Sequence, residues 1–439
     1  MTATTLADRR AAVRQGLRSS GTTSGPAATR TATGADARTR PGRTAIRRRA
    51  AGPDRGEARV RDPLAKRQVR EIHRHTGAIP TSVYVVGGIV AVLTMLGLVM
   101  VLSASSVSLV HDGVSPWAYF VRQILWALIG TISLFTTMRV PYGRWRGWVR
   151  PGLIASYMLM VLPFIPGLGS ARNGARAWVE LGPIGFQPSE FLKLAVLLYT
   201  ADLLTKREDR MQVVRATLWP CLAMLGVSSA FMLAQGDLGS AIVLSSIVLA
   251  MVFIGGTPMT PLTVSGIGLG LVGLGFVYST DYRRARFTAF LDLAKNKDHL
   301  GYQVWSALVG IQDGGVTGAG IGAGKAKWSR LPLAHSDFIF AVIAEELGLI
   351  GVVAVMGCYL LLAYFGVQIA LGAADRFGML IAGGVAAWIT VQTIINVGGV
   401  TGTMPLTGLT LPFMSFGGSS LFVTMTAAGL LLSVARSSA

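Results

Sequence analysis

Ionisable side chains inside apolar runs are the strongest chemical signal in this 439-residue sequence. Each costs about 3 kcal/mol or more at the centre of a membrane-spanning helix, so it persists where it is paired or used. Asp337 stands in the sequence Leu-Pro-Leu-Ala-His-Ser-Asp-Phe-Ile-Phe, whose apolar groups would restrict water. An acid at the edge of such a low-dielectric site, near cations, is suited to general-base catalysis. The alternative is that Asp337 caps the helix that follows it.

Other acids and bases within the apolar runs have a structural explanation beside a functional one. Glu190 and Lys193 lie three residues apart on one helical face, which predicts either a local ion pair or a role in binding a ligand. Asp237 lies at a tight turn, where it either has a functional role or only caps the next helix. Glu345 and Glu346 are expected to hold helices or neighbouring cations together rather than to contact a substrate.

Two familiar types of site are excluded by residue identity. The run from Gly318 to Lys325 resembles a phosphate-binding loop, but a Walker sequence needs Gly in place of Ala319 and Ser or Thr in place of Ala326. The five His and two Cys residues are scattered along the chain. We therefore expect neither an ATP site nor a His/Cys metal cluster.

The elements that must position these residues are membrane helices. The chain is 51% apolar and 14% charged, its mean hydropathy is +0.54, and its apolar residues form runs of about twenty, the length that spans a ~30 Å hydrocarbon core. Outer-membrane barrels have shorter, alternating strands. The sequence predicts an all-α, polytopic membrane protein with about ten transmembrane helices. The runs lie approximately at 82–104, 118–138, 151–167, 188–205, 216–234, 238–256, 260–279, 338–370, 378–397 and 418–435.

The charge distribution predicts two domains and a topology. Residues 1–80 carry 18 Arg or Lys against 6 acids, a net charge of +12, with no apolar period, which predicts a disordered basic cytoplasmic tail. The tail either follows the positive-inside rule and lies on anionic lipid, or binds nucleic acid or a partner. The remaining membrane domain, 81–436, has basic residues in alternate short loops. Both termini are therefore expected to be cytoplasmic.

Two external segments depart from the simple pattern. The loop 281–336 has eight basic residues against four acids, which predicts an anionic ligand or lipid headgroup unless the loop is only solvated. The stretch 397–418 is apolar but rich in Gly and Pro, so it cannot be a plain spanning helix. Irregular backbone at membrane depth must be covered by protein, so we expect this stretch to pack back into the outer face of the bundle.

Several of these motifs together resemble one family. By them the chain is identified as a member of the shape, elongation, division and sporulation (SEDS) family of bacterial membrane glycosyltransferases, with the nearest match to its FtsW branch rather than to RodA or SpoVE. The resemblance covers about residues 82–436. The matching segments are Asn173–Trp178, Gln187–Lys193, Gln235–Ala241, Tyr282–Arg286, Gly301–Gln303, His335–Ala341, Glu345–Gly348, Pro405–Gly408 and Pro412–Ser420.

The resemblance implies a peptidoglycan polymerase of cell division. Family members join lipid II, a disaccharide-pentapeptide on undecaprenyl pyrophosphate, into glycan strands on the outer face of the cytoplasmic membrane. The family's essential aspartate matches Asp337, the implied catalytic base. The chain departs from the family at Gly236 and Leu333, where Pro and Glu are common. The implied substrate-binding residues are Arg176, Glu190, Lys193, Arg283, Arg284, Arg286, Lys325, Lys327, Arg330, His335, Ser415 and Ser419.

Cofactor, partners and rival functions follow from the same resemblance. No cofactor is assigned, and a divalent cation, Mg or Mn, near Asp337 is left open. The expected partners are lipid II, a class B penicillin-binding protein that cross-links the peptides, other divisome proteins and the membrane, but no nucleic acid. The expected location is the cytoplasmic membrane at the division septum. A lipid II flippase, a recruiting scaffold and the elongation paralogue RodA are the alternatives.

Overall fold

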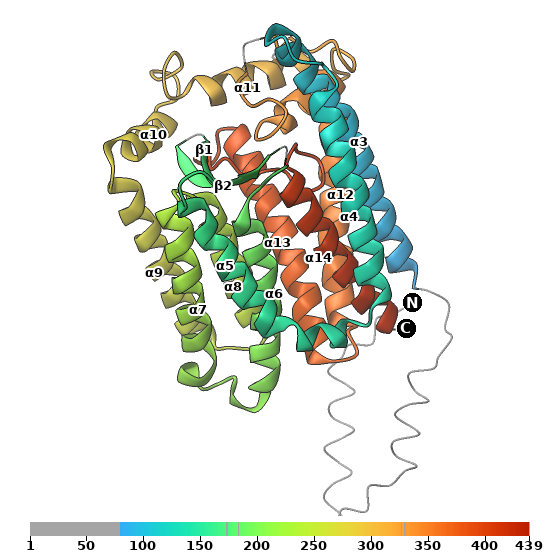
Figure 1. Cartoon of the computed structure of the whole chain (residues 1–439), viewed down its shortest axis with the longest axis vertical. Coiled ribbons are helices and arrows are strands. Elements are labelled where there is room, and N and C mark those ends of the chain that lie inside the picture. The colour runs from blue at the N-terminus through green and yellow to red at the C-terminus, as the bar shows by residue number, and fades with distance from the viewer. Residues whose placement is uncertain (1–79, 173, 183, 326, 329–330, 439) are drawn as a thin grey trace, which may run out of the picture. The chain divides into compact units, whose positions relative to one another are not determined.

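The computed structural model describes residues 80–172, 174–182, 184–325, 327–328 and 331–438. The predicted tail, 1–80, thus lies almost entirely outside the described residues. The described chain is mainly helical (Figure 1). The helices are α3 (Thr81–His111), α4 (Ala118–Arg139), α5 (Val149–Val161), α6 (Pro188–Lys206), α7 (Val214–Ala234), α8 (Leu238–Ile254), α9 (Met259–Tyr278), α10 (Asp281–Leu291), α11 (Tyr302–Gly314), α12 (Ile339–Leu371), α13 (Arg376–Val400) and α14 (Gly418–Ser437), with short 3-10 helices at Tyr142–Gly147, Leu162–Phe164 and Glu208–Arg210.

A helix occupies each of the ten positions at which the sequence predicts a span. Within the described residues, seven helices are long and apolar enough to cross a membrane, namely α3, α4, α7, α9, α12, α13 and α14. Helices α5 and α8 are apolar but shorter, and α6 carries four charged residues. The predicted fold class, a mainly helical multi-pass membrane protein, is confirmed.

The core of the bundle lies around α13 and α14. In their most apolar windows, 67% and 83% of the residues are buried, whereas none of the window of α9 is. Helix α14 packs on α4, and α12 packs on α13 and α11. The start of α3 and the end of α14 lie at one end of the bundle, while α10, α11 and a small sheet lie at the other (Figure 1).

A three-stranded antiparallel sheet follows α5, and we did not predict it from the sequence. It has the order β1 (Gly169–Arg172), β2 (Ala175–Leu181), β3 (Ile184–Phe186), with Val179 paired to both neighbours. Ala177 and Val179 are buried on one face, and Gly174 turns the chain at φ 81°. The strand signal is an alternation of seven residues, too short to stand out beside apolar runs of twenty.

The segment 281–336 is more ordered than a loop. It contains α10 and the amphipathic α11, and its glycine-rich part, 315–320, pairs with α12 where that helix breaks at Gly348 (φ 64°, ψ −165°). Backbone N–H groups of Ala319 and Gly320 donate to the carbonyls of Glu345 and Glu346, both at 2.9 Å. The glycine run that imitates a phosphate loop therefore satisfies the backbone of a broken helix.

The non-helical segment 401–417 packs back into the bundle, as predicted. Leu411, Phe413 and Met414 in it are buried, and a Cβ added at Gly97 of α3 would lie 2.6 Å from the Met414 Cα. Its carbonyls accept hydrogen bonds from side chains of three helices. The donors are Gln123 Nε2 to Ser415 (3.1 Å), Tyr359 OH to Pro412 (2.5 Å), Gln392 Nε2 to Thr410 (2.9 Å) and Asn396 Nδ2 to Leu409 (2.7 Å).

Candidate active site

Asp337 lies just before α12, 9% exposed, where the bundle meets the segment 281–336. The N-cap position of α12 belongs to Phe338, so the alternative that Asp337 caps this helix does not hold. A Cβ added at Gly408, which has φ 73°, would lie 3.6 Å from Asp337 Oδ2. The carboxylate therefore faces the non-helical segment 401–417 at a position where the chain carries no side chain.

The protonation behaviour of Asp337 suits a base. Burial raises the pKa of this carboxyl from 3.8 to about 6, against the opposing effects of a hydrogen bond from the Ser336 side chain and the charge of Arg286. A carboxyl with a pKa of about 6 is mostly ionised at pH 7, yet it is a stronger base than an exposed aspartate. Its environment thus provides what proton abstraction near neutral pH requires.

Three successive carbonyls around Asp337 are held by the C-terminal part of the chain. The His335 carbonyl accepts from Phe416 N (2.9 Å), the Ser336 carbonyl from Ser415 Oγ (2.6 Å), and the Asp337 carbonyl from Asn396 Nδ2 (3.0 Å). Ser415 is buried and also accepts from Leu411 N (2.8 Å). Ser415 is predicted to bind substrate, and in the structure its hydroxyl holds the backbone next to Asp337 by a hydrogen bond.

His335 packs against two aromatic rings, which are stacked on each other. Its ring centroid lies 4.8 Å from that of Tyr119 and 5.5 Å from that of Phe416. Burial lowers the pKa of His335 from 6.5 to about 4, so the ring is neutral at pH 7. A contact of His335 with substrate would therefore be a neutral hydrogen bond or a stacking contact.

The predicted cations differ in how far their charges are already engaged by neighbouring groups. Arg286 of α10 acts electrostatically on Asp337. Arg283 lies over the Phe276 ring at 3.9 Å, and Arg284 pairs with Asp281 at 3.0 Å. Arg176 in β2 is exposed. Arg330 lies outside the described residues.

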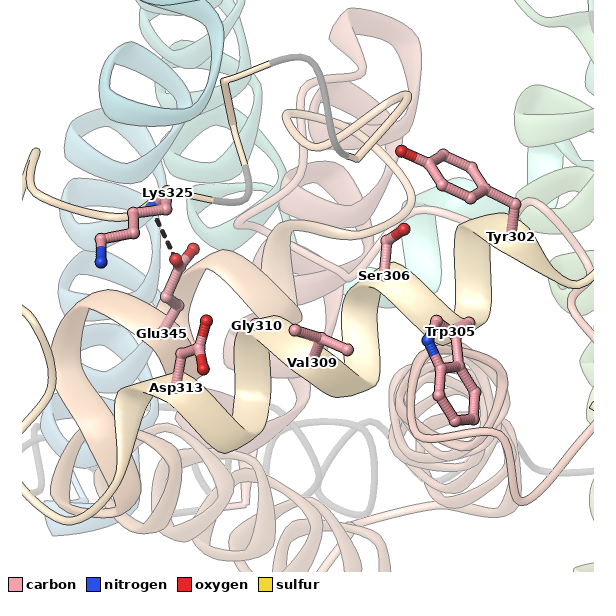
Figure 2. Close-up of a pocket in the computed structure, with 8 residues that line it drawn as sticks. All are labelled: Tyr302, Trp305, Ser306, Val309, Gly310, Asp313, Lys325 and Glu345. Atoms are coloured by element: carbon pink, nitrogen blue, oxygen red, sulfur yellow. Dashed lines mark hydrogen bonds between the residues drawn. The ribbon is translucent and has the colours of Figure 1, made fainter. Parts of the chain in front are cut away.

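Two lysines of the glycine-rich segment have opposite environments. Lys325 is exposed and lines a cavity of about 260 Å³ between α11 and Glu345 (Figure 2). Lys327 is 3% exposed, and its Nζ donates to Glu346 Oε1 (2.8 Å), Ser103 Oγ (3.0 Å) and the Gly322 carbonyl (2.7 Å). This confirms the expectation that Glu346 holds a neighbouring cation. Lys327 is committed to packing, not to an external anion.

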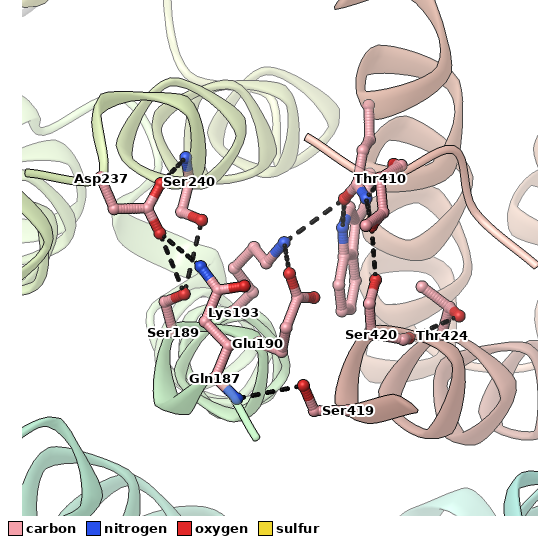
Figure 3. A network of polar contacts seen from close by, with 12 residues as sticks. Gln187, Ser189, Glu190, Lys193, Asp237, Ser240, Thr410, Ser419, Ser420 and Thr424 are labelled. Atoms are coloured by element: carbon pink, nitrogen blue, oxygen red, sulfur yellow. Dashed lines mark hydrogen bonds and ion pairs between the residues drawn. The ribbon is translucent and has the colours of Figure 1, made fainter. Parts of the chain in front are cut away.

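Two charged side chains buried in α6, Glu190 and Lys193, are likewise engaged in contacts within the protein. Lys193 Nζ lies 2.9 Å from Glu190 Oε1, and both side chains are buried (Figure 3). The ammonium also donates to Gln392 Oε1 at 3.3 Å. The predicted ion pair is confirmed, although Glu190 Oε2 has no partner among the described atoms. Ser419 Oγ accepts from the Gln187 N–H at 3.1 Å.

Asp237 caps α8, which is one of its two predicted roles. Its Oδ1 accepts from Ser240 N at 2.9 Å, and its Oδ2 accepts from Gln187 Nε2 at 2.8 Å (Figure 3). These bonds tie the start of α8 to the start of α6. Both helix ends therefore lie at fixed positions beside the sheet end of the bundle.

Sequence reasoning missed the buried amides. Gln392 and Asn396 lie four residues apart in an apolar run, which places both on one face of α13. Amides are uncharged, so they stand out less in an apolar run than ionisable groups do, although buried amides commonly hydrogen-bond across membrane helices. Among the described residues, no group of three or more His, Cys, Asp or Glu side chains is arranged to hold a metal ion.

Comparison with known proteins gives consistent matches over the membrane domain. A family model described as cell cycle protein, FTSW_RODA_SPOVE, matches residues 84–439. The probable peptidoglycan glycosyltransferase FtsW of Geobacter sp. (strain M18) is 39% identical over 350 residues, 78% of this chain and 94% of the relative. Stage V sporulation protein E of Bacillus subtilis (strain 168) is 37% identical over 349 residues, 79% of this chain and 95% of the relative.

Solved structures show the same architecture. A chain from a peptidoglycan synthase complex, described as coordinating polymerization and crosslinking, aligns with a TM-score of 0.66 at 31% identity, over 80% of this chain and 97% of that one. The crystal structure of the rod shape determining protein RodA of Thermus thermophilus aligns with a TM-score of 0.59 at 30% identity, over 80% and 95% of the two chains.

The two lysines of the glycine-rich segment provide a matched test of the buried network. Lys327→Ala should lower stability by about 3–5 kcal/mol, because it leaves the Glu346 carboxylate buried without its counter-charge. Lys325→Ala should change stability by less than about 0.5 kcal/mol, because its side chain is exposed. Thermal unfolding in detergent measures both. Equal melting temperatures for the two variants would show that the buried pair does not stabilise the fold.

Proposed function

We infer that this chain, which belongs to the FtsW, RodA and SpoVE family of cell cycle proteins, is a peptidoglycan glycosyltransferase of cell division, as its FtsW relatives are named. The observation that carries the chemistry is Asp337, a buried carboxylate with a raised pKa beside Arg286. A glycosyl transfer to a sugar hydroxyl needs one base near the acceptor oxygen, and the site supplies one.

The proposed reaction joins two lipid II molecules. Asp337 takes the proton of the acceptor sugar 4-hydroxyl while that oxygen forms a bond to the donor anomeric carbon. The bond from that carbon to the pyrophosphate oxygen breaks, and undecaprenyl pyrophosphate leaves with the electron pair. On the side of Gly408 the backbone of segment 401–417 comes close to the carboxylate, since a Cβ added there would lie 3.6 Å from Asp337 Oδ2.

Anion binding falls to a smaller set of cations than the sequence suggests. We propose that Arg283, Arg284, Arg286 and Lys325 contact the pyrophosphate, since cations near phosphate form charge-assisted bonds about twice as strong as neutral ones. Lys327 is left out because it is buried against Glu346. An Mg or Mn ion in this region would accompany the pyrophosphate, as Mg²⁺ commonly does with substrate phosphates.

The alternative functions are less well supported. A flippase is expected to use charges within the bundle, but Glu190, Lys193, Lys327 and Glu346 are already engaged in ion pairs there. Relatives named FtsW favour the division branch over RodA. We propose accordingly that this multi-pass membrane protein works at the division septum, with both termini in the cytoplasm.

Replacing the base tests the proposed chemistry. Asp337→Asn should fold and bind lipid II but lose polymerisation about 100-fold or more, the usual scale for removing general-base catalysis. The measurement is the formation of glycan ladders from lipid II labelled on the sugar. In the unmodified protein the rate should fall as pH drops through about 6, because the carboxylate is then protonated. Near-normal ladders from the Asn variant would refute the assignment.

Removing the four proposed cations tests the pyrophosphate site. Ala substitutions at Arg283, Arg284, Arg286 and Lys325 should weaken lipid II binding and make it less sensitive to salt, because exposed charge interactions are screened. Arg215→Ala, at the start of α7 on the predicted cytoplasmic side, is the control and should bind normally. If the four substitutions leave affinity and salt dependence unchanged, the segment 281–336 does not hold the anion.

We also propose a class B penicillin-binding protein as partner. Peptide cross-linking needs an activated nucleophile in an external domain, and the external segments here contain no Ser-x-x-Lys. The similarity to a chain of a synthase complex supports such a pairing. The partner's span would lie against the outer helices, and its external part would contact residues 281–336.

The pairing predicts conditional activity. Glycan synthesis by the isolated chain should be low and should rise when the cognate transpeptidase is added, because contact with 281–336 would order the surroundings of Asp337. Ladder assays with and without the partner measure this. Full activity of the chain alone, with no co-purification in mild detergent, would contradict it.

A further inference from the structure

We propose that Asn396 of α13 is the positioning residue that fixes the catalytic base against the segment it faces. The proposal rests on the function proposed above. A single amide nitrogen, Nδ2, donates to two carbonyls, that of Asp337 at 3.0 Å and that of Leu409 at 2.7 Å. One of these residues carries the base, and the other adjoins Gly408, which lies against the carboxylate. Asn396 thereby joins the two halves of the site.

The neighbouring contacts show why this position matters. Ser415 and Phe416 hold the carbonyls of Ser336 and His335, which fixes the backbone before the base. In the described part of the chain, the Asp337 carbonyl itself is held by Asn396. Because a misplacement of about 1 Å can cost about 100-fold in rate, the residue that fixes this peptide has direct influence on catalysis.

The environment of Asn396 argues against a purely stabilising role. Its side chain is 4% exposed, yet its Oδ1 has no hydrogen-bond partner among the described atoms. An unsatisfied buried acceptor is unfavourable, and such groups in native structures call for an explanation other than packing. The two hydrogen bonds of Nδ2, to the carbonyls of Asp337 and Leu409, provide one, because they hold the amide in the orientation that leaves Oδ1 unpaired.

Few charges surround the base that Asn396 holds. Arg286 of α10 acts on it, and His335 on the same segment is neutral above about pH 4. Segment 401–417 contains no ionisable residue, and α13 contains only Arg376 at its first position. Farther along α12, Glu345 accepts a hydrogen bond from the Lys325 backbone N–H, and Glu346 is paired with Lys327. A new carboxylate at position 396 would therefore be felt by Asp337 with little compensation.

Three variants test whether Asn396 positions the base or only provides hydrogen bonds to backbone carbonyls. Asn396→Ala removes both hydrogen bonds of Nδ2, and Asn396→Asp keeps the side-chain shape but replaces the donor by an acid. Tyr359→Phe is the matched control, because it removes one hydrogen bond to the same segment, at Pro412, without touching Asp337. The assay measures kcat, KM and the pH profile of polymerisation from lipid II, with the full chain and its transpeptidase partner present in all samples.

The expected result is a split between the variants. Asn396→Ala should lower kcat about 10- to 100-fold with KM changed less than about threefold, while Tyr359→Phe keeps kcat within about threefold. Asn396→Asp should also move the acid limb above its value of about 6 in the unmodified protein, because a second buried acid raises the apparent pKa of the pair.

The opposite result is equally clear. Equal losses for Asn396→Ala and Tyr359→Phe, with the acid limb of Asn396→Asp unmoved, would show that the amide only satisfies carbonyls. That result overturns this inference while Asp337→Asn stays inactive. An active Asp337→Asn, by contrast, would refute the proposed function itself, so the two failures are distinguishable.

Discussion

The structure depends on satisfying backbone that is not helical inside an apolar bundle. Hydrocarbon offers no hydrogen bonds, so each free N–H or C=O there is costly unless protein supplies its partner. Segment 401–417 meets this requirement with amides and a phenol from surrounding helices: Gln123, Tyr359, Gln392 and Asn396. The break in α12 meets it with main chain, because residues 315–320 pair with the carbonyls and N–H groups on both sides of Gly348.

The same requirement concentrates the chemistry in one region. In a regular helix the backbone carbonyls accept hydrogen bonds from the same helix. Carbonyls of irregular segments accept instead from side chains of other helices, which brings those side chains to one place. Asp337 lies where the 281–336 segment, the start of α12 and the 401–417 segment meet, and each of the three carbonyls from residue 335 to 337 is bonded to the chain between 396 and 416. The base is positioned by backbone that the bundle must satisfy in any case.

Hydropathy and local spacing predicted the parts of the fold that depend on short stretches of sequence. The ten apolar runs, the i, i+3 ion pair of Glu190 with Lys193, and the capping role of Asp237 each depend on residues close in sequence. The hydrogen bond from Lys327 to Ser103 could not be predicted, because the two residues are 224 positions apart. The role of Asn396 could not be predicted for a similar reason, because it depends on contacts with Asp337, 59 residues earlier, and with Leu409, 13 residues later.

Ion pairing distinguishes Asp337 from the buried acids Glu190 and Glu346. Glu190 and Glu346 each lie within hydrogen-bonding distance of a buried lysine, so their charges are neutralised in place. Removing either lysine would strand a charge, which makes such pairs structural constraints. Asp337 has no ion-pair partner within the described ranges, and burial raises its pKa to about 6. A carboxylate that is buried, held through its backbone and not neutralised by a paired cation keeps its affinity for a proton, and that affinity is what a base must offer to a sugar hydroxyl.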